Sequence, residues 1–184
     1  DHGELGRDGQ TRCEAGQAWQ WDGVAFSVLH PSAADYERAD AKPNTLSCVL
    51  RIVDAQGHSL LVTGDIEAAQ EQRLLRQAGA ALRSSVLVVP HHGSTTSSTA
   101  EFLDAVAPDT AVVQAGYRNR FGHPAPPVLA RYGERGIRVI RTDACGAWRW
   151  PVDDGAGGAV CERDAAARYW QHRPSRDGAE LAIR

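Results

Sequence analysis

The run Ser85 to Val89 (SVLVV) constrains the fold of this 184-residue chain more than any other feature. An apolar, β-branched run without polar alternation is typical of a strand that is buried on both faces. Such a strand needs packed layers around it. The flanking segments 66–77 and 98–106 are predicted to be helices, the first from its apolar spacing and the second from a capping box at 98–101. The sequence therefore predicts a layered α/β fold.

Further strands and turns are visible on both sides of this run. A hairpin is predicted over 17–30, because apolar residues surround the tight-turn dipeptide Asp22-Gly23. The polar stretch 32–43 has no period and is predicted to be a loop. The other predicted elements are strands at 46–53, 59–63, 110–114 and 137–141, a helix at 128–132, and short strands near 147–150 and 159–161.

Length and composition fit one folded domain. With 42% hydrophobic residues, the chain can bury a sizeable core. The sequence contains no methionine and opens with polar residues, so we expect it to be a piece of a longer chain. We assign residues 1–12 to a polar extension, 13–165 to the domain and 166–184 to a tail.

Charge is unevenly distributed along the chain. The net charge of −3 argues against a protein that coats nucleic acid with a basic surface. No apolar run approaches the ~20 residues of a membrane helix, so we expect the chain by itself to be soluble. Between 115 and 151 the local balance is nevertheless +5, and these arginines either hold phosphates or form solvated faces. They are Arg118, Arg120, Arg131, Arg135, Arg138, Arg141 and Arg149.

The four cysteines lack the C-x-x-C spacing of a zinc cage. Cys145 and Cys161 bracket two predicted strands that are joined through residues 153–155 (DDG). They form a cross-strand disulfide if the compartment is oxidising, and otherwise they are buried thiols. The sequence favours neither alternative.

Three loops carry residues that are suited to chemistry, and each follows an apolar strand. Loops after neighbouring strands can meet at one edge of a sheet. Imidazole and carboxylate groups are ligands for Zn²⁺ and Mn²⁺, which lower the pKa of bound water to ~7. Each loop taken alone is as common in an ordinary turn, so the metal site is indicated by the three together. They are Thr63-Gly64-Asp65, His91-His92-Gly93-Ser94 and Gly122-His123-Pro124.

These motifs also carry a resemblance to a known family. The segments TGDIE (63–67), VLVVPHHGSTTSST (86–99) and GYRNRFGHP (116–124) resemble the metallo-β-lactamase-like C-terminal domain of the ComEC family of competence proteins. The similarity extends over residues 13–150. It implies a metallo-β-lactamase-like αββα sandwich, of which this chain holds the C-terminal half and the preceding hairpin.

The resemblance implies roles for individual residues. Asp65, His91, His92 and His123 match catalytic positions, and Asp65, His91 and His123 match metal ligands, although which of the two adjacent histidines faces metal stays open. Asn44 lies where many members of the wider superfamily have a histidine, and the superfamily's leading H-x-H-x-D-H motif is absent. The implied substrate-binding residues are Asn44, Ser94, Ser97, Arg118, Asn119 and Arg120.

The implied function is metal-dependent hydrolysis of DNA during natural transformation, by a nuclease domain of a DNA-uptake channel protein. The implied cofactors are one or two Zn²⁺ or Mn²⁺ ions. The implied partners are single-stranded DNA, the transmembrane channel portion of the same protein and other competence proteins, at the periplasmic face of the bacterial inner membrane.

Two other functions are considered. A catalytically degraded domain could guide DNA or support channel assembly, which the Asn44 position favours. A serine hydrolase using Ser94 beside His92 lacks both the G-x-S-x-G elbow and an orienting carboxylate.

Overall fold

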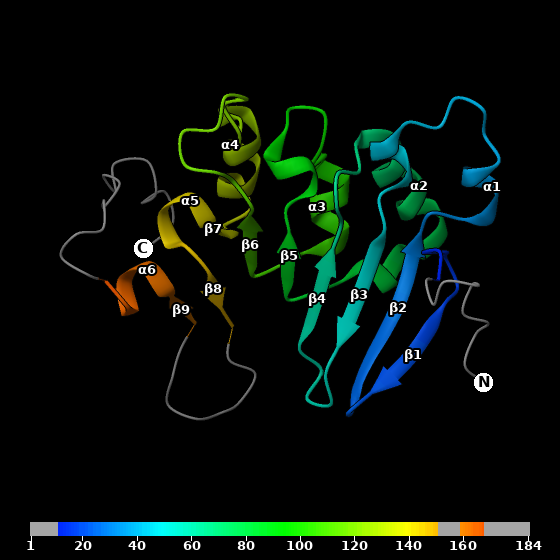
Figure 1. Cartoon of the computed structure of the whole chain (residues 1–184), viewed down its shortest axis with the longest axis horizontal. Coiled ribbons are helices and arrows are strands. Elements are labelled where there is room, and N and C mark those ends of the chain that lie inside the picture. The colour runs from blue at the N-terminus through cyan, green and yellow to red at the C-terminus, as the bar shows by residue number, and fades with distance from the viewer. Residues whose placement is uncertain (1–10, 151–158, 168–184) are drawn as a thin grey trace.

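A computed structural model describes residues 11–150 and 159–167, in which seven strands form one sheet in chain order from β1 to β7 (Figure 1). Strands β1 to β4 are antiparallel, whereas β4 to β7 are parallel. Most of the predicted extension 1–12 and tail 166–184, and the turn 153–155, lie outside the described residues. The strands are β1 (Ala18–Trp21), β2 (Val24–His30), β3 (Val49–Val53), β4 (Ser59–Val62), β5 (Val86–Val88), β6 (Thr110–Val113) and β7 (Arg138–Arg141).

The predicted hairpin is confirmed, because β1 and β2 pair antiparallel around Asp22 and Gly23. Both turn residues have positive φ, as a primed two-residue turn requires. The predicted loop 32–43 is wrong in part, since a short helix α1 (Ala33–Tyr36) lies within it. The buried carboxylate of Asp35 accepts hydrogen bonds from the backbone N–H and the hydroxyl of Ser32, and it is paired with Arg73.

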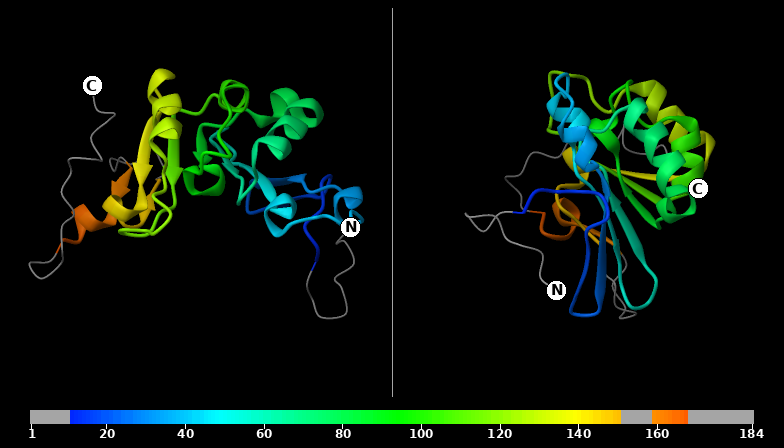
Figure 2. Two further views of the ribbon diagram at one scale, coloured as in Figure 1. Left: turned by 90° about the horizontal axis from the view of Figure 1, so that it is seen from above. Right: turned by 90° about the vertical axis from the view of Figure 1, so that its right-hand side faces the viewer.

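Each parallel strand is reached through a crossover that contains a helix. Right-handed crossovers that always advance in one direction place their helices on the same face of a sheet. Figure 2 shows this arrangement, with α2, α3 and α4 together on one side. The crossover elements are α2 (Ala68–Ala78), the 3₁₀ turns η2 (Gly79–Leu82) and η3 (Pro90–Gly93), α3 (Ala100–Val106) and α4 (Pro126–Glu134), and a further turn η1 (Pro43–Leu46) precedes β3.

The main core lies between the sheet and these three helices. Among the described residues, no helix has both the length and the apolar character needed to cross a membrane. The buried strand β5 contributes Leu87 to this core and Val86 to the opposite face, as the predicted double burial requires. Fully buried members of the core are Leu61, Leu74, Phe102, Val113, Val128 and Tyr132.

The opposite face of β5–β7 carries a smaller unit (Figure 2). It consists of α5 (Thr142–Cys145), β8 (Trp148–Arg149), β9 (Val160–Cys161) and α6 (Glu162–Ala165), with β8 and β9 paired antiparallel. Of the two alternatives for Cys145 and Cys161, the structure has the disulfide. A second disulfide, Cys13–Cys48, was not predicted.

The α/β class is confirmed, and the predicted strands and helices are present with shifted ends. The capping box predicted at 98–101 is wrong. Thr99 is the N-cap of α3 but makes no side-chain cap hydrogen bond. The buried carboxylate of Glu71, on α2, instead accepts hydrogen bonds from the backbone N–H groups of Ser98 (2.5 Å) and Thr99 (2.8 Å). A distant acidic residue therefore satisfies the first amides of α3.

Candidate functional site

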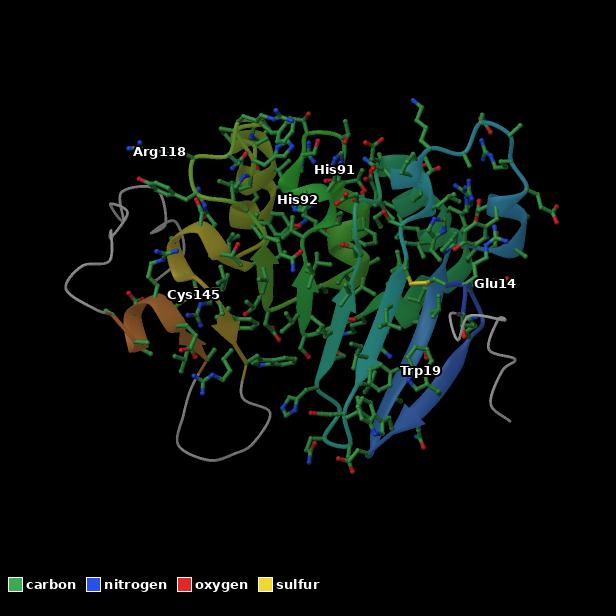
Figure 3. All side chains as sticks on the ribbon, viewed as in Figure 1. Glu14, Trp19, His91, His92, Arg118 and Cys145 are labelled. Carbon is green, nitrogen blue, oxygen red and sulfur yellow. A yellow bond between two sulfur atoms is a disulfide. The ribbon has the colours of Figure 1, made fainter. Side chains whose placement is uncertain are left out.

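The three predicted loops follow β4, β5 and β6, which are adjacent and parallel. Their carboxyl ends therefore lie at one edge of the sheet, where ligands are usually bound in open α/β sheets. Figure 3 shows His91 and His92 at this edge, with Arg118 on the neighbouring loop that leads from β6 to α4. The structure thus brings the predicted loops together.

The backbone around Asp65 is held by β5 and by the segment before β3. The hydroxyl of Thr63 donates to the carbonyl oxygen of Val88 (2.7 Å), and the N–H of Asp65 donates to the hydroxyl of Ser47 (3.0 Å). Gly64 has positive φ and packs so closely on Ser47 that an added Cβ would lie 3.0 Å from the serine Cβ. The Asp65 carboxylate remains 41% exposed on a fixed backbone.

His91 and His92 both adopt the left-handed backbone conformation, with φ of 47° and 55°. Two consecutive non-glycine residues in this region are uncommon, and such outliers concentrate at functional sites. The N–H of His91 donates to the carbonyl oxygen of Gly64 (3.0 Å), which ties this turn to the Asp65 loop. The two imidazoles point toward different partners as a result.

His92 faces Asp65. Its Nδ1 lies 2.8 Å from the carbonyl oxygen of Gln114, and because a carbonyl only accepts, Nδ1 carries a proton. In the neutral ring Nε2 is then an acceptor, and it lies 3.3 Å from the carboxylate Oδ1 of Asp65. Two acceptors that face each other at this distance favour a positive charge between them, and a divalent cation bound by both would supply it.

His91 is held by other groups. Its Nδ1 lies 3.3 Å from the carboxylate of Glu67 and 3.4 Å from the hydroxyl of Thr96. Its Nε2 lies 3.4 Å from the amide nitrogen of Asn44, which can donate to it. Both ring nitrogens of His91 are therefore occupied by protein groups.

His123 completes the group of imidazoles. Its ring centroid lies 6.1 Å from that of His91, and its Nδ1 is a buried nitrogen without a hydrogen-bond partner among the described residues. Desolvation lowers the pKa of His123, and the charges of His91 and His92 lower it further. The ring therefore favours its neutral form, which has a free lone pair for a cation.

Four of the six predicted substrate-binding residues, the two asparagines and the two serines, fall into two sets. Asn44 contacts His91, and the side-chain amide of Asn119 brackets the His123 backbone, donating to its carbonyl (2.6 Å) and accepting from its N–H (3.0 Å). Ser94 and Ser97 are buried instead. The Ser97 hydroxyl contacts the carbonyls of Pro90 (2.8 Å) and Ser94 (3.1 Å), so it braces the turn and does not line a cleft.

No family model matches the chain. Curated proteins do, and the similarity extends over most of its length. It is 45% identical over 168 residues to competence protein ComA of Neisseria gonorrhoeae, covering 91% of this chain and 23% of that protein. It is 40% identical over 144 residues to recombination protein 2 of Haemophilus influenzae, covering 78% and 17%. ComE operon protein 3 of Bacillus subtilis is 35% identical over 142 residues, covering 77% and 18%.

The chain belongs to the ComEC family. It spans about a fifth of the length of these curated relatives, as the covered shares of 23%, 17% and 18% show.

Several residues at the site of this ComEC-family chain were not predicted. Glu67 and Thr96 contact His91, and the carbonyl of Gln114 orients His92. Glu67 lies in the motif TGDIE and Thr96 in the motif HHGSTTSST. Their closeness in sequence to the predicted ligands is the feature from which they could have been predicted. A backbone carbonyl such as that of Gln114 leaves no signal in the sequence.

Most of the arginines between residues 115 and 151 bind other groups within the fold. Arg131 donates to the carbonyls of Ser97 and Ser98. Arg135 pairs with Asp104, Arg141 with Asp143 and Arg149 with Glu162. Arg118 and Arg120 are exposed beside the site and are the members of this set best placed to meet a phosphate.

The side chains fit a metal in type but not in number. A histidine oriented through Nδ1 by a carbonyl, a facing carboxylate and a buried imidazole nitrogen without a partner are the features of a metal ligand shell. Within 11–150 and 159–167, however, no group of three or more His, Cys, Asp or Glu side chains is arranged to hold an ion. A metal here needs ligands beyond these.

Replacing Gly93 by alanine is expected to lower the free energy of unfolding by about 2 kcal/mol. Gly93 has φ +80°, and an added Cβ would lie 2.7 Å from the Cβ of Pro124, the residue after His123. The matched control is Gly122→Ala, at φ +67° with open space around it, which should lose about 1 kcal/mol from backbone strain alone. Urea denaturation measures both, and equal losses would contradict the close packing of the two loops.

Proposed function

We propose that this ComEC-family chain forms part of a metal-dependent phosphodiesterase that acts on DNA during DNA uptake. The observation that carries the proposal is the pair of facing acceptors, His92 Nε2 and Asp65 Oδ1 at 3.3 Å, beside the unpartnered nitrogen of His123. Relatives named competence protein ComA, recombination protein 2 and ComE operon protein 3 support a role in competence.

Each histidine then has a distinct task. Asp65 and His92, whose facing acceptor atoms are 3.3 Å apart, would hold the metal. The described side chains do not form a ligand group of three as they stand, so His123 and ligands from outside the described residues would complete the site. When bound, a divalent ion supplies a hydroxide at neutral pH and polarises a phosphodiester oxygen. His91, held between Glu67 and Asn44, would act by positioning or by binding the phosphate. This assignment differs from the set expected from the motif, in which His91 was a ligand.

We also propose that a second sheet layer covers one face of the sheet. On the face of β1–β4 that turns away from α2, the cross-strand partners Trp19, Phe26, Ile52 and Leu60 form an apolar row, and all four are partly or largely exposed. The solvent face of an antiparallel sheet is normally polar. The row supports a second sheet layer over this face, as in a metallo-β-lactamase-like αββα sandwich.

The two disulfides support a location. All four cysteines are paired, as is usual in oxidising compartments and rare in the cytosol. We therefore propose that the chain lies at the periplasmic face of the inner membrane. The partners that we propose from the resemblance are the transmembrane channel portion of the same protein and other competence proteins.

The test is cleavage of end-labelled single-stranded DNA by protein that carries this chain, with Mn²⁺ or Zn²⁺ and with EDTA. We expect metal-dependent cleavage that His123→Ala reduces by about 100-fold, the range for a metal-site residue. His58→Ala is the control, because His58 pairs with Asp54 in the β3–β4 turn, at the opposite end of these strands. Equal cleavage by the wild type and His123→Ala would end the proposal.

A second candidate is a domain that guides DNA without cutting it. The incomplete ligand group among the described residues favours it, as does Asn44 at a position where histidine is common. Binding of DNA without metal-dependent cleavage would favour this candidate.

A further inference from the structure

The loop between β6 and α4 combines aromatic and basic residues, with an arginine on each side of Asn119 and an aromatic residue at each end, in the order Tyr117-Arg118-Asn119-Arg120-Phe121. Tyr117 is 47% exposed and Phe121 67% exposed. The other large exposed hydrophobic side chains among the described residues are Trp19 and Trp21, on β1. Figure 3 shows Trp19 far from the site, whereas Arg118 lies at the same edge as His91 and His92. These aromatic and basic residues thus lie at the edge of the sheet that carries the candidate site.

The aromatic surface continues directly from the histidines. The ring of Phe121 stacks on that of His123, with centroids 5.9 Å apart and an angle of 16° between the planes. Each aromatic ring is also accompanied by a guanidinium. Arg120 lies 4.9 Å from the Phe121 centroid and Arg118 lies 5.2 Å from the Tyr117 centroid. Each guanidinium thus lies over part of an aromatic ring, so a base that stacks on that face would displace the guanidinium toward the adjoining phosphate.

Internal hydrogen bonds hold the loop in this form. The N–H of Asn119 donates to Gly116 O (3.1 Å), and the N–H of Gly122 donates to Asn119 O (3.3 Å). The Asn119 side chain binds both backbone groups of His123. The aromatic rings are thus presented on an ordered backbone, which reduces the entropy lost when a ligand binds.

Isolated exposed aromatic residues are common and need no ligand to explain them. Here, however, the pairing with arginine specifies a chemistry. Every nucleobase offers a π face to an aromatic ring, and guanidinium groups bind phosphates. A duplex hides those faces by stacking, so the loop fits single strands.

We propose that Phe121 and Tyr117 stack unpaired bases while Arg118 and Arg120 hold the adjoining phosphates, so that a single strand is led to His123. This inference rests on the proposed action on DNA and adds the side chains that hold the strand by its bases. It adds two base-binding residues to a site otherwise composed of ligands and charges.

The test is fluorescence anisotropy in EDTA, with a labelled oligothymidylate and an abasic strand of the same length. Phe121→Ala should weaken binding of oligothymidylate about 10-fold, as loss of one stacked base does, and leave the abasic strand unchanged. Phe121→Trp should bind like the wild type. Phe121→Leu keeps an apolar contact with His123 but has no flat face, so it should bind like the alanine variant. Trp21→Ala is the control and should change nothing.

The outcomes separate this inference from the proposed phosphodiesterase. Cleavage that needs metal, together with unchanged binding by Phe121→Ala, overturns the stacking alone. If binding depends on Phe121 but no cleavage is seen, the stacking is supported and the proposed phosphodiesterase activity is excluded. Equal affinity for the oligothymidylate and the abasic strand, equal affinity for duplex DNA, or no binding at all also overturns the stacking.

Discussion

Replacing Glu71 by alanine is expected to lower the free energy of unfolding by about 3 kcal/mol, because it leaves buried donors unsatisfied. The Glu71 side chain is fully buried and accepts hydrogen bonds from the backbone N–H groups of Ser98 and Thr99 at the start of α3. Alanine has no acceptor for either N–H group, and Ser98 is fully buried. The loss should appear as a lower urea midpoint with an unchanged slope.

Glu101→Ala is the matched control, since Glu101 is an exposed acidic residue in the first turn of the same helix. It should lose less than about 1 kcal/mol, the usual size of an exposed charge interacting with a helix end. If the two variants unfold at the same urea concentration, the carboxylate of Glu71 does not cap α3.

The same carboxyl gives the stability a dependence on pH. Burial raises the pKa of Glu71, although hydrogen bonds from Thr99 and Ser98 and the charge of Arg131 oppose the rise. The folded chain therefore binds this proton more tightly than the unfolded chain. The stability that the folded chain gains from this proton is complete below the ordinary glutamate pKa. It is lost as the pH rises through the raised pKa of Glu71. Glu71→Gln should remove that decline.

The sequence predicted those parts of the fold that depend on neighbouring residues. The hairpin could be predicted from Asp22-Gly23, and β5 from an unbroken apolar run. Both features are determined by residues that are adjacent in sequence. The cap of α3 could not be predicted in this way. Its acceptor lies 27 residues before Ser98, and a local capping box offered a plausible but incorrect alternative.

The candidate site likewise has features that the sequence predicts and others that it does not. The three loops could be predicted to meet because each follows a strand, and parallel order then places them at one edge. The different directions of His91 and His92 could not be predicted. They depend on two consecutive left-handed residues and on the carbonyl of Gln114, none of which has a signature in residue type. Identifying which histidine meets Asp65 required coordinates.

Breaking the disulfide Cys13–Cys48 is expected to lower the free energy of unfolding by about 4 kcal/mol, because the bond closes a long loop in the unfolded chain. The two cysteines are 35 residues apart and enclose the hairpin, α1 and the segment that carries Asn44 and Ser47 to the site. The double variant Cys13→Ser with Cys48→Ser should therefore also exchange the Asp65 amide hydrogen faster, since that N–H is bonded to Ser47.

The second disulfide provides the comparison. Cys145 and Cys161 are 16 residues apart on the other side of the molecule, so Cys145→Ser with Cys161→Ser should lose about 3 kcal/mol. It should leave exchange at Asp65 unchanged, because Ser47, which accepts the hydrogen bond from the Asp65 amide, lies outside its loop. Thermal unfolding and amide exchange measure both effects. Equal acceleration at Asp65 in the two variants would mean that the first bond adds global stability without holding the site, and that Ser47 is positioned by β3 and β4 alone.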